Sequence, residues 1–143
     1  MAYVSLDSDQ IKKAHKKHKY SKTQVEQLEK CMDEKSGPLY FMKSFMKIQH
    51  PVKGSIPFHP FPYQERLISS YNDHRFSIAM LPRQTGKTTC ASGFLIWYAM
   101  FRPDSQILIA AHKYAGASDI MSRVRYAYEM LPSWIKAGVT QYN

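Results

Sequence analysis

The sequence predicts an α/β fold in which helices flank a parallel sheet and a mostly helical extension precedes that sheet. Apolar runs of strand length alternate with helix-like segments after residue 62, the order typical of parallel sheets. The runs SIAML and ILIAA are continuously apolar, as expected of strands buried on both faces. The segment between these runs is long enough for a right-handed crossover helix.

The composition is that of one basic globular domain. The 143 residues include 20 Lys and Arg against 11 Asp and Glu, and the net charge of +9 favours polyanionic partners such as nucleic acid or phosphates. No run approaches the ~18 apolar residues of a membrane span, and MAYVSLDSDQ lacks the pattern of a leader, so we expect no membrane association and a cytoplasmic location. Cys31 and Cys90 form no CxxC pair, which argues against a zinc site or a disulfide framework.

Residues 1–37 are predicted to form the polar helical extension, with two short helices between residues 8 and 35. Few apolar residues occur here, so neither helix can bury much surface, and we expect a mobile or docked extension that ends at Gly37-Pro38. The candidate caps are Ser8 or Asp9 for the first helix, and Ser21 with Gln24, or Thr23 with Glu26, for the second.

A cluster of basic residues lies in the first of these helices: Lys12, Lys13, His15, Lys16, Lys17, His18 and Lys19. Two interpretations of the cluster stay open. It contacts DNA phosphates by releasing counterions, or it is a solvated face without a partner, which is the commoner role of charge runs. No cysteine or carboxylate completes a metal-ligand set around its two histidines.

Residues 38–62 are predicted to be a helix followed by a proline-rich connector. Pro38 opens the helix, in which apolar residues recur at helical spacing. Prolines at the density found in the connector exclude a regular helix and favour a loop with extended pieces. The apolar positions of the helix are Leu39, Met42, Phe45 and Met46, and the connector contains Pro51, Gly54, Pro57, Pro60 and Pro62.

The alternating elements occupy residues 63–143. Their predicted order is helix 63–71, strand 76–81, helix 87–101, strand 106–111 and helix 116–131. The stretch LPRQTGKTT, from Leu81 to Thr89, lies between the first strand and the second helix. Because the phosphate loop of a P-loop NTPase lies between a strand and a helix, residues 63–143 are predicted to be the first part of a P-loop ATPase domain.

This loop supplies groups that bind a nucleoside triphosphate together with Mg²⁺. Backbone N–H groups and the helix N-terminus face the phosphates, Lys87 reaches the β- and γ-phosphate oxygens, and the Thr88 hydroxyl takes a place on the metal. Leu81 stands where the GxxxxGK[ST] motif has its first glycine, so only the second half of the motif is matched. The predicted ATP-binding residues of the loop are Gln84, Thr85, Gly86, Lys87, Thr88 and Thr89.

Two side chains near the loop are further candidates. Arg83 lies within reach of a γ-phosphate and is a candidate catalytic residue beside Lys87, or else it is a surface arginine paired with a carboxylate. Gln64 opens the preceding helix and either bonds the adenine edge, with Phe61 or Tyr63 stacked on the base, or belongs to an exposed helix start. Both pairs of alternatives stay open on the residues alone.

The acids that complete an NTPase centre are not evident. Such an enzyme needs an acid at the end of a later apolar strand to hold the metal, and usually a glutamate to activate water. The acids after Lys87 are Asp104, Asp119 and Glu129, and none of them ends an apolar strand. We therefore expect weak ATP binding at most, and no appreciable turnover, from this chain alone.

The chain resembles the N-terminal ATPase region of the large terminase subunit of tailed bacteriophages, of the T-even type. Residues 39–143 carry the resemblance, above all FPYQERLISSYNDHRFSIAMLPRQTGKTTCASGFLIWYAMF and ILIAAHKYAGASDIMSRVRYAYEMLPSWIKAGV. The phosphate loop of that family reads R-Q-x-G-K-[ST]-[ST], which Arg83 to Thr89 match position by position. The resemblance implies that Arg83 acts in cis on the γ-phosphate and that Gln64 contacts adenine, and His112-Lys113 matches the segment after the second strand.

The resemblance also implies a role and a set of partners. Terminases of this type use ATP to package double-stranded DNA into proheads, which implies a homo-oligomeric ring, a portal, a small terminase subunit, and the cytoplasm of an infected bacterium as the location. The acid-bearing strand, coupling motif and nuclease domain of the family have no counterpart in the sequence, so we expect a fragment. Two alternatives stay open: a helicase-like DNA-dependent ATPase fragment, and a non-catalytic basic DNA-binding or interaction fragment.

Overall fold

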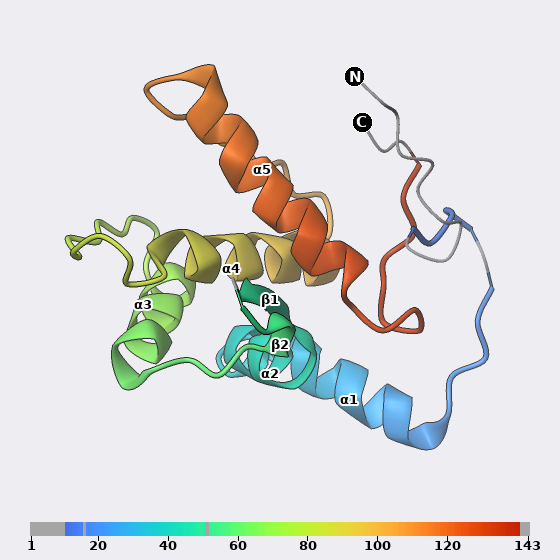
Figure 1. Cartoon of the computed structure of the whole chain (residues 1–143). Coiled ribbons are helices and arrows are strands. Elements are labelled where there is room, and N and C mark those ends of the chain that lie inside the picture. The colour runs from blue at the N-terminus through green and yellow to red at the C-terminus, as the bar shows by residue number, and fades with distance from the viewer. Residues whose placement is uncertain (1–10, 16, 51, 141–143) are drawn as a thin grey trace, which may run out of the picture.

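The computed structural model describes residues 11–15, 17–50 and 52–140 (Figure 1). Over these residues the chain forms helices and one small two-stranded sheet. None of the described helices is long and apolar enough to cross a lipid bilayer. The elements are α1 (Lys22–Met32), α2 (Gly37–Phe45), β1 (Lys47–His50), β2 (Gly54–Pro57), α3 (Pro62–Asp73), α4 (Lys87–Phe101) and α5 (Tyr114–Glu129).

Local sequence signals explain where α1 and α2 begin. Ser21 caps α1 as predicted, because its hydroxyl accepts from the Gln24 amide at 3.2 Å and the Gln24 side chain accepts from the Ser21 amide at 3.0 Å. Pro38 lies in the first turn of α2, where its missing N–H costs no helical hydrogen bond. A side chain at Gly37 would overlap the Cys31 carbonyl, so glycine permits the close approach of the two helices.

The proline-rich connector contains extended pieces, as predicted, and they pair as an antiparallel hairpin. His50, the last residue of β1, pairs with Gly54, the first residue of β2. The His50 ring closes the turn, because its Nδ1 accepts from the amides of Val52 and Lys53 at 3.2 and 3.1 Å. β1 then lies against α5, and β2 lies against α2.

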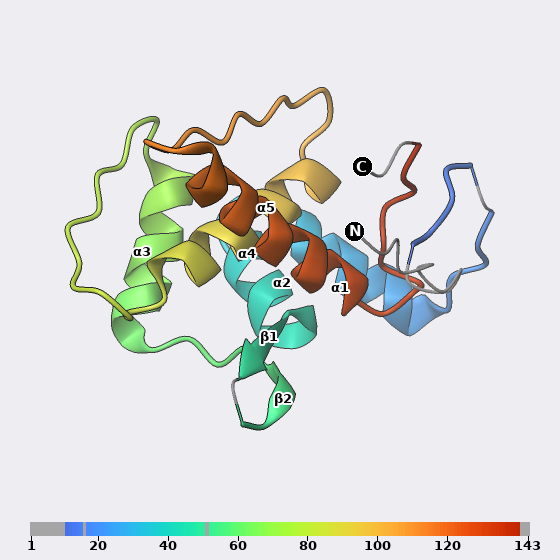
Figure 2. The same cartoon turned by 45° about the horizontal axis from the view of Figure 1, so that its top comes forward.

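The core lies where α2, α3 and α4 meet, and α5 crosses over α4 (Figure 2). Phe41 from α2, Ile68 from α3 and Trp97 from α4 are at most 1% exposed. The buried indole also has a polar partner, since Trp97 Nε1 donates to the Cys31 carbonyl at 2.7 Å. Apolar burial among these helices therefore sets the position of α4, whose first turn follows the candidate phosphate loop.

The prediction of a parallel sheet requires a correction. The predicted helices 63–71, 87–101 and 116–131 correspond to α3, α4 and α5. However, neither 76–81 nor 106–111 is a strand, and the hairpin is the one sheet within the described ranges. A strand needs a hydrogen-bonded neighbour along its edge, and neither run has one here. The described residues therefore form helices and a small two-stranded sheet without the expected parallel sheet, an arrangement that does not conflict with an incomplete α/β fragment.

We refer to residues 76–81 and 106–111 as the bare runs. Each keeps part of its apolar surface outside the core, although Ala79 and Leu81 of the first run pack against it. Neither run is hydrogen-bonded to a strand among the described residues. The most exposed large side chains are Phe76 at 81%, Ile78 at 95%, Met80 at 92% and Leu108 at 92%.

The first helix predicted in the N-terminal extension is also wrong for the described residues, because residues 11–15 and 17–20 contain no helix. The backbone here pairs with the C-terminal segment instead. Val139 N donates to the Lys12 carbonyl at 2.9 Å, and Ala14 N donates to the Val139 carbonyl at 3.2 Å. The residues of this prediction that lie outside the described ranges are Ser8, Asp9 and Lys16.

Candidate phosphate-binding site

The N-terminus of α4 is open to an anion. Gly86 is its N-cap, no side chain caps the helix, and no acidic residue lies in its first turn. The amides of Lys87, Thr88 and Thr89 have no acceptor within the helix by its geometry. Three N–H groups and the positive end of the helix dipole therefore converge on one point, which is a favourable arrangement for a phosphate.

The loop before α4 turns sharply at two residues in the left-handed backbone region. Gln84 has φ +63° and Gly86 has φ +77°. Glycine adopts this region without the steric cost that a Cβ brings, which explains why the N-cap is glycine. The Thr85 hydroxyl closes the turn by donating to the Pro82 carbonyl at 2.9 Å. Left-handed turns of this kind expose successive amides on one side of the chain, which suits an anionic ligand.

Lys87 lies across the loop. Its ammonium donates to the carbonyls of Leu81 and Pro82, at 2.6 and 2.8 Å. These acceptors are neutral, whereas phosphate oxygens carry negative charge and form stronger hydrogen bonds with an ammonium. The ammonium is thus held inside the loop by bonds that a phosphate group can replace.

The start of α3 holds the loop from behind. Tyr63 Oη donates to the Thr85 carbonyl at 3.1 Å, and Gln64 Nε2 donates to the same carbonyl at 3.0 Å. Gln64 Oε1 accepts from the Phe61 amide at 2.9 Å, and the Gln64 residue is 6% exposed. The structure therefore brings Gln64 to the loop, where its amide is bonded to the loop backbone and to its own helix start.

We call these contacts of Tyr63 and Gln64 with the Thr85 carbonyl the loop clasp. A Cβ on Gly86 would lie 2.6 Å from Gln64 Nε2, so the clasp also needs glycine at this position. The sequence reasoning missed the Tyr63 bond, because it joins positions 22 apart in the chain and no periodic pattern encodes such a contact. The one available signal was that tyrosine and glutamine both carry donors at a helix start.

The remaining predicted residues lie around this loop or apart from it. Arg83 is exposed and forms no ion pair with a described residue, so the alternative of a carboxylate partner is not observed. Phe61 is 62% exposed and stacks on Tyr63, with ring centroids 5.8 Å apart. His112 and Lys113 are exposed before α5, and no hydrogen bond joins them to the loop. The structure thus joins the start of α3 to the loop by hydrogen bonds, whereas His112 and Lys113, which follow the second bare run, are not bonded to it.

The residues present fit a triphosphate better than they fit a metal alone. Thr88 offers one hydroxyl oxygen at the start of α4, and Mg²⁺ prefers oxygen ligands that include those of the bound phosphates. Among the described residues, no group of three His, Cys, Asp or Glu side chains is arranged to hold a metal ion. Any Mg²⁺ at this loop would therefore depend on the nucleotide for much of its coordination.

Cys90 lies one turn into α4 and contributes no chemistry to the site. Burial raises the pKa of its thiol to about 11, so the sulfur stays protonated near neutral pH. A protonated, buried thiol is a poor nucleophile and a poor metal ligand. The polar chemistry of this region is therefore that of the loop amides, the Lys87 ammonium and the neighbouring hydroxyls.

The comparison with protein families assigns the part of the chain that contains this loop. Residues 78–141 match the family model described as "Terminase large subunit, T4likevirus-type, N-terminal". The match begins in the first bare run, includes the loop and all of α4, and extends beyond α5. The family resemblance drawn from the residues is thus confirmed over this stretch.

Proposed function

We propose, from the terminase match over residues 78–141, that this chain is an N-terminal ATPase fragment of a phage terminase large subunit that binds ATP at the Gln84–Thr89 loop. The observation that supports ATP binding best is the uncapped N-terminus of α4 with the Lys87 ammonium beside it. Amides and an ammonium that meet at one point favour the β- and γ-phosphates of a nucleotide. In the full-length protein, ATP turnover would drive packaging of double-stranded DNA into proheads.

Each residue of the loop has a proposed role in this complex. The amides of Gln84, Thr85 and Gly86, with those of the first turn of α4, bind phosphate oxygens. Lys87 exchanges its bonds to the Leu81 and Pro82 carbonyls for bonds to the β- and γ-phosphates. Thr88 contributes its hydroxyl to the Mg²⁺ that accompanies the nucleotide.

The residues next to the loop complete the proposal. Arg83 is exposed and without an ion pair among the described residues, so its guanidinium is available to the γ-phosphate. Gln64 holds the loop through Thr85, and the exposed ring of Phe61 offers a face on which the base can stack. The adenine contact proposed for Gln64 then uses the donor and acceptor capacity that the loop clasp leaves free.

The partners follow from the same proposal. A packaging ATPase contacts double-stranded DNA, and the net charge of +9 supports binding to a polyanion. A homo-oligomeric ring, a portal and a small terminase subunit are the proposed protein partners, in the cytoplasm of the infected bacterium and at the prohead portal.

ATP binding is tested by titrating the chain with ATP and Mg²⁺ in a calorimeter, for the native sequence and two lysine variants. Lys87→Ala is expected to weaken binding by at least about tenfold, because a charge-assisted contact with phosphate is lost. Lys113→Ala is the matched control, since it removes the same charge from an exposed position before α5, and it should leave the affinity nearly unchanged. Equal affinities of all three chains would favour the non-catalytic basic module.

Turnover is a separate test. We expect no appreciable phosphate release from the pure chain, because Asp104, Asp119 and Glu129 are the acids that follow Lys87 and none of them ends an apolar strand. Release is measured with a phosphate sensor at saturating ATP. Stable release that disappears in Lys87→Ala would contradict the expectation and show that the chain supplies its own metal-holding acid.

A further inference from the structure

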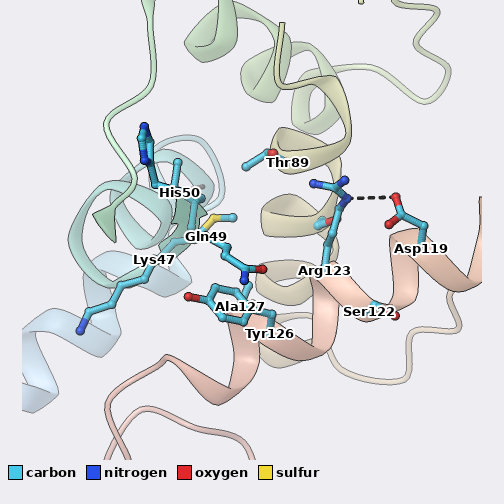
Figure 3. A pocket seen from close by; sticks show the side chains of 12 residues that line it. Lys47, Gln49, His50, Thr89, Asp119, Ser122, Arg123, Tyr126 and Ala127 are labelled. Carbon is cyan, nitrogen blue, oxygen red and sulfur yellow. Dashed lines mark hydrogen bonds and ion pairs between the residues drawn. The ribbon is translucent and has the colours of Figure 1, made fainter. Parts of the chain in front are cut away.

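A cavity lies beside the first two turns of α4, and Tyr63 and Gln64 of the loop clasp are not among its lining residues. It is a cavity of about 400 Å³ between β1, α4 and α5 (Figure 3). Its size is within the range of small-molecule sites in proteins. The lining side chains that carry the argument are Met46, Ile48 and Gln49 from the hairpin side, Thr89 and Ser92 from α4, and Arg123 from α5.

Ser92 provides an independent sign that this cavity takes a ligand. The residue is 1% exposed, and its Oγ forms no hydrogen bond with the described protein atoms. A buried hydroxyl without a partner costs about 1–3 kcal/mol, so such groups are rare unless something else bonds them. Ser92 lines the cavity, but its Oγ has almost no exposed surface, so the side chain must rotate toward the cavity for a ligand there to supply the missing bond.

The cavity is rich in hydrogen-bond donors. Arg123 Nε is bonded to Asp119 Oδ2 at 3.1 Å, which leaves the two terminal nitrogens of the guanidinium for another acceptor. In Figure 3 the guanidinium of Arg123 lies beside α4 close to Thr89, with Asp119 on its far side. The side chains of Lys47 and His50 point away from Arg123 in the same view. The donors around the cavity therefore include those of Arg123, Thr89, Ser92 and Gln49.

Apolar surface lies next to these donors. Met46 and Ala127 are 4 and 3% exposed and form part of the core that borders the cavity, and Ile48 packs against that core. A ligand that fills the cavity thus needs an apolar body as well as an acceptor-rich head. A phosphate group suits the head better than a carboxylate, because it has three terminal oxygens for the donors of Arg123, Thr89 and Ser92.

We propose that this cavity binds a small phosphate ester with an apolar body, whose phosphate accepts hydrogen bonds from Arg123, Thr89 and Ser92. The site differs from the phosphate loop, because residues 84–88 do not line it, and Thr89 is the one loop residue that the two sites share. The ligand would contact the same helix that begins at the loop, on the face that packs toward α5. This proposal goes beyond ATP binding and does not depend on it.

Phenyl phosphate is the probe that tests the site. Its binding to the full chain is measured by amide chemical shifts and by calorimetry. Binding should shift amides of β1, α4 and α5, and inorganic phosphate and phenol alone should each bind at least about tenfold more weakly than phenyl phosphate. Arg123→Gln should weaken binding by at least about tenfold, because it removes the positively charged guanidinium that bonds the phosphate. Ser92→Ala should weaken binding several-fold without lowering the melting temperature, because its hydroxyl has no protein partner to lose.

Lys87→Ala is the control that separates this site from the phosphate loop, and it should leave phenyl phosphate binding unchanged. Loss of binding in Lys87→Ala, with retention in Arg123→Gln, would overturn the proposal and place the probe at the loop. Unaltered binding in Ser92→Ala, or no binding at millimolar probe, would overturn it as well. None of these outcomes bears on ATP affinity, which Lys87→Ala tests in its own titration.

Discussion

Two isoleucines ten positions apart illustrate two regions of the molecule. Ile68 lies on α3 and is 0% exposed, whereas Ile78 lies in the first bare run and is 95% exposed. Ile68 has mostly polar neighbours in the sequence and Ile78 lies in a continuously apolar run, yet Ile68 is packed into the core and Ile78 is not. The difference is one of secondary structure and its requirements, since hydrophobicity is the same at the two positions.

A helix and a strand satisfy their backbones in different ways. In α3 the N–H and C=O groups bond within the segment, so the helix needs only one apolar neighbour to become buried. A strand takes its hydrogen bonds from a neighbouring strand, and an apolar strand of a parallel sheet needs cover on both faces. The bare runs have no strand beside them among the described residues, so their outer side chains stay exposed.

The largest effect is expected from truncating the buried member of the pair. Ile68→Ala should lower the free energy of unfolding by about 2–5 kcal/mol, because it removes buried methyl groups and leaves a cavity among α2, α3 and α4. Urea unfolding monitored by circular dichroism measures this change. A loss below about 0.5 kcal/mol would contradict a tightly packed core at this position.

The next largest effect is a fall of stability at high pH, caused by the burial of the two thiols. Burial raises the pKa of Cys31 to about 12 and that of Cys90 to about 11, from an ordinary value of 9.0. Between pH 9.0 and about 11 the unfolded chain loses these protons while the folded chain keeps them. Stability should therefore be complete below pH 9.0 and fall above it, by about 1.4 kcal/mol per thiol for each pH unit.

Urea unfolding at about pH 8 and about pH 10 measures this fall, with the double variant Cys31→Ala, Cys90→Ala as the control. The tyrosines and lysines titrate in both proteins, so the difference between the two falls isolates the thiols. An equal fall in both proteins would mean that the thiols ionise in the folded chain as readily as in the unfolded one.

A smaller effect, on ATP affinity, is expected where the packed helix α3 contacts the loop that follows the first bare run. Tyr63→Phe removes the donor to the Thr85 carbonyl and should weaken ATP binding by about two- to tenfold, the value of one hydrogen bond. Tripolyphosphate should lose affinity by the same factor, because the change acts on the phosphate loop. Tyr71→Phe makes the same change further along α3 and should have no effect on either ligand.

The comparison of the two ligands decides between two roles for Tyr63. A loss of affinity for ATP with none for tripolyphosphate would show that Tyr63 acts on the base, through its stacking with Phe61. Melting temperatures of both tyrosine variants check that the chain stays folded in each titration.

The helices of this fold are predictable from sequence because their signals are local. The box of Ser21 with Gln24 marks the start of α1, Pro38 marks the first turn of α2, and the prediction for 87–101 matches α4 at both ends. The missed features depend on distant partners. Pairing of Lys13 with Val139 replaces the first predicted helix, and the two runs predicted as strands have no neighbour to pair with among the described residues.

The features of the candidate site likewise divide into those with local sequence signals and those that depend on distant partners. The positions of Gly86 and Lys87 at the start of a helix follow from a short motif, and the structure places them there. The contacts that hold the loop do not follow from any motif, because Tyr63 and Gln64 reach Thr85 across the sequence. ATP binding itself, and the roles of Arg83 and Thr88, stay predictions that the titrations address.

The smallest effect is expected from the exposed member of the isoleucine pair. Ile78→Ala should change the free energy of unfolding by less than about 0.5 kcal/mol, because its side chain is 95% exposed and leaves no cavity. The same urea experiment measures it, with Ile68→Ala as the matched substitution. A loss of about 2 kcal/mol or more would mean that Ile78 is buried in solution, as it would be in the predicted parallel sheet. The result therefore discriminates between a bare run and a strand at residues 76–81, using one residue type in both regions.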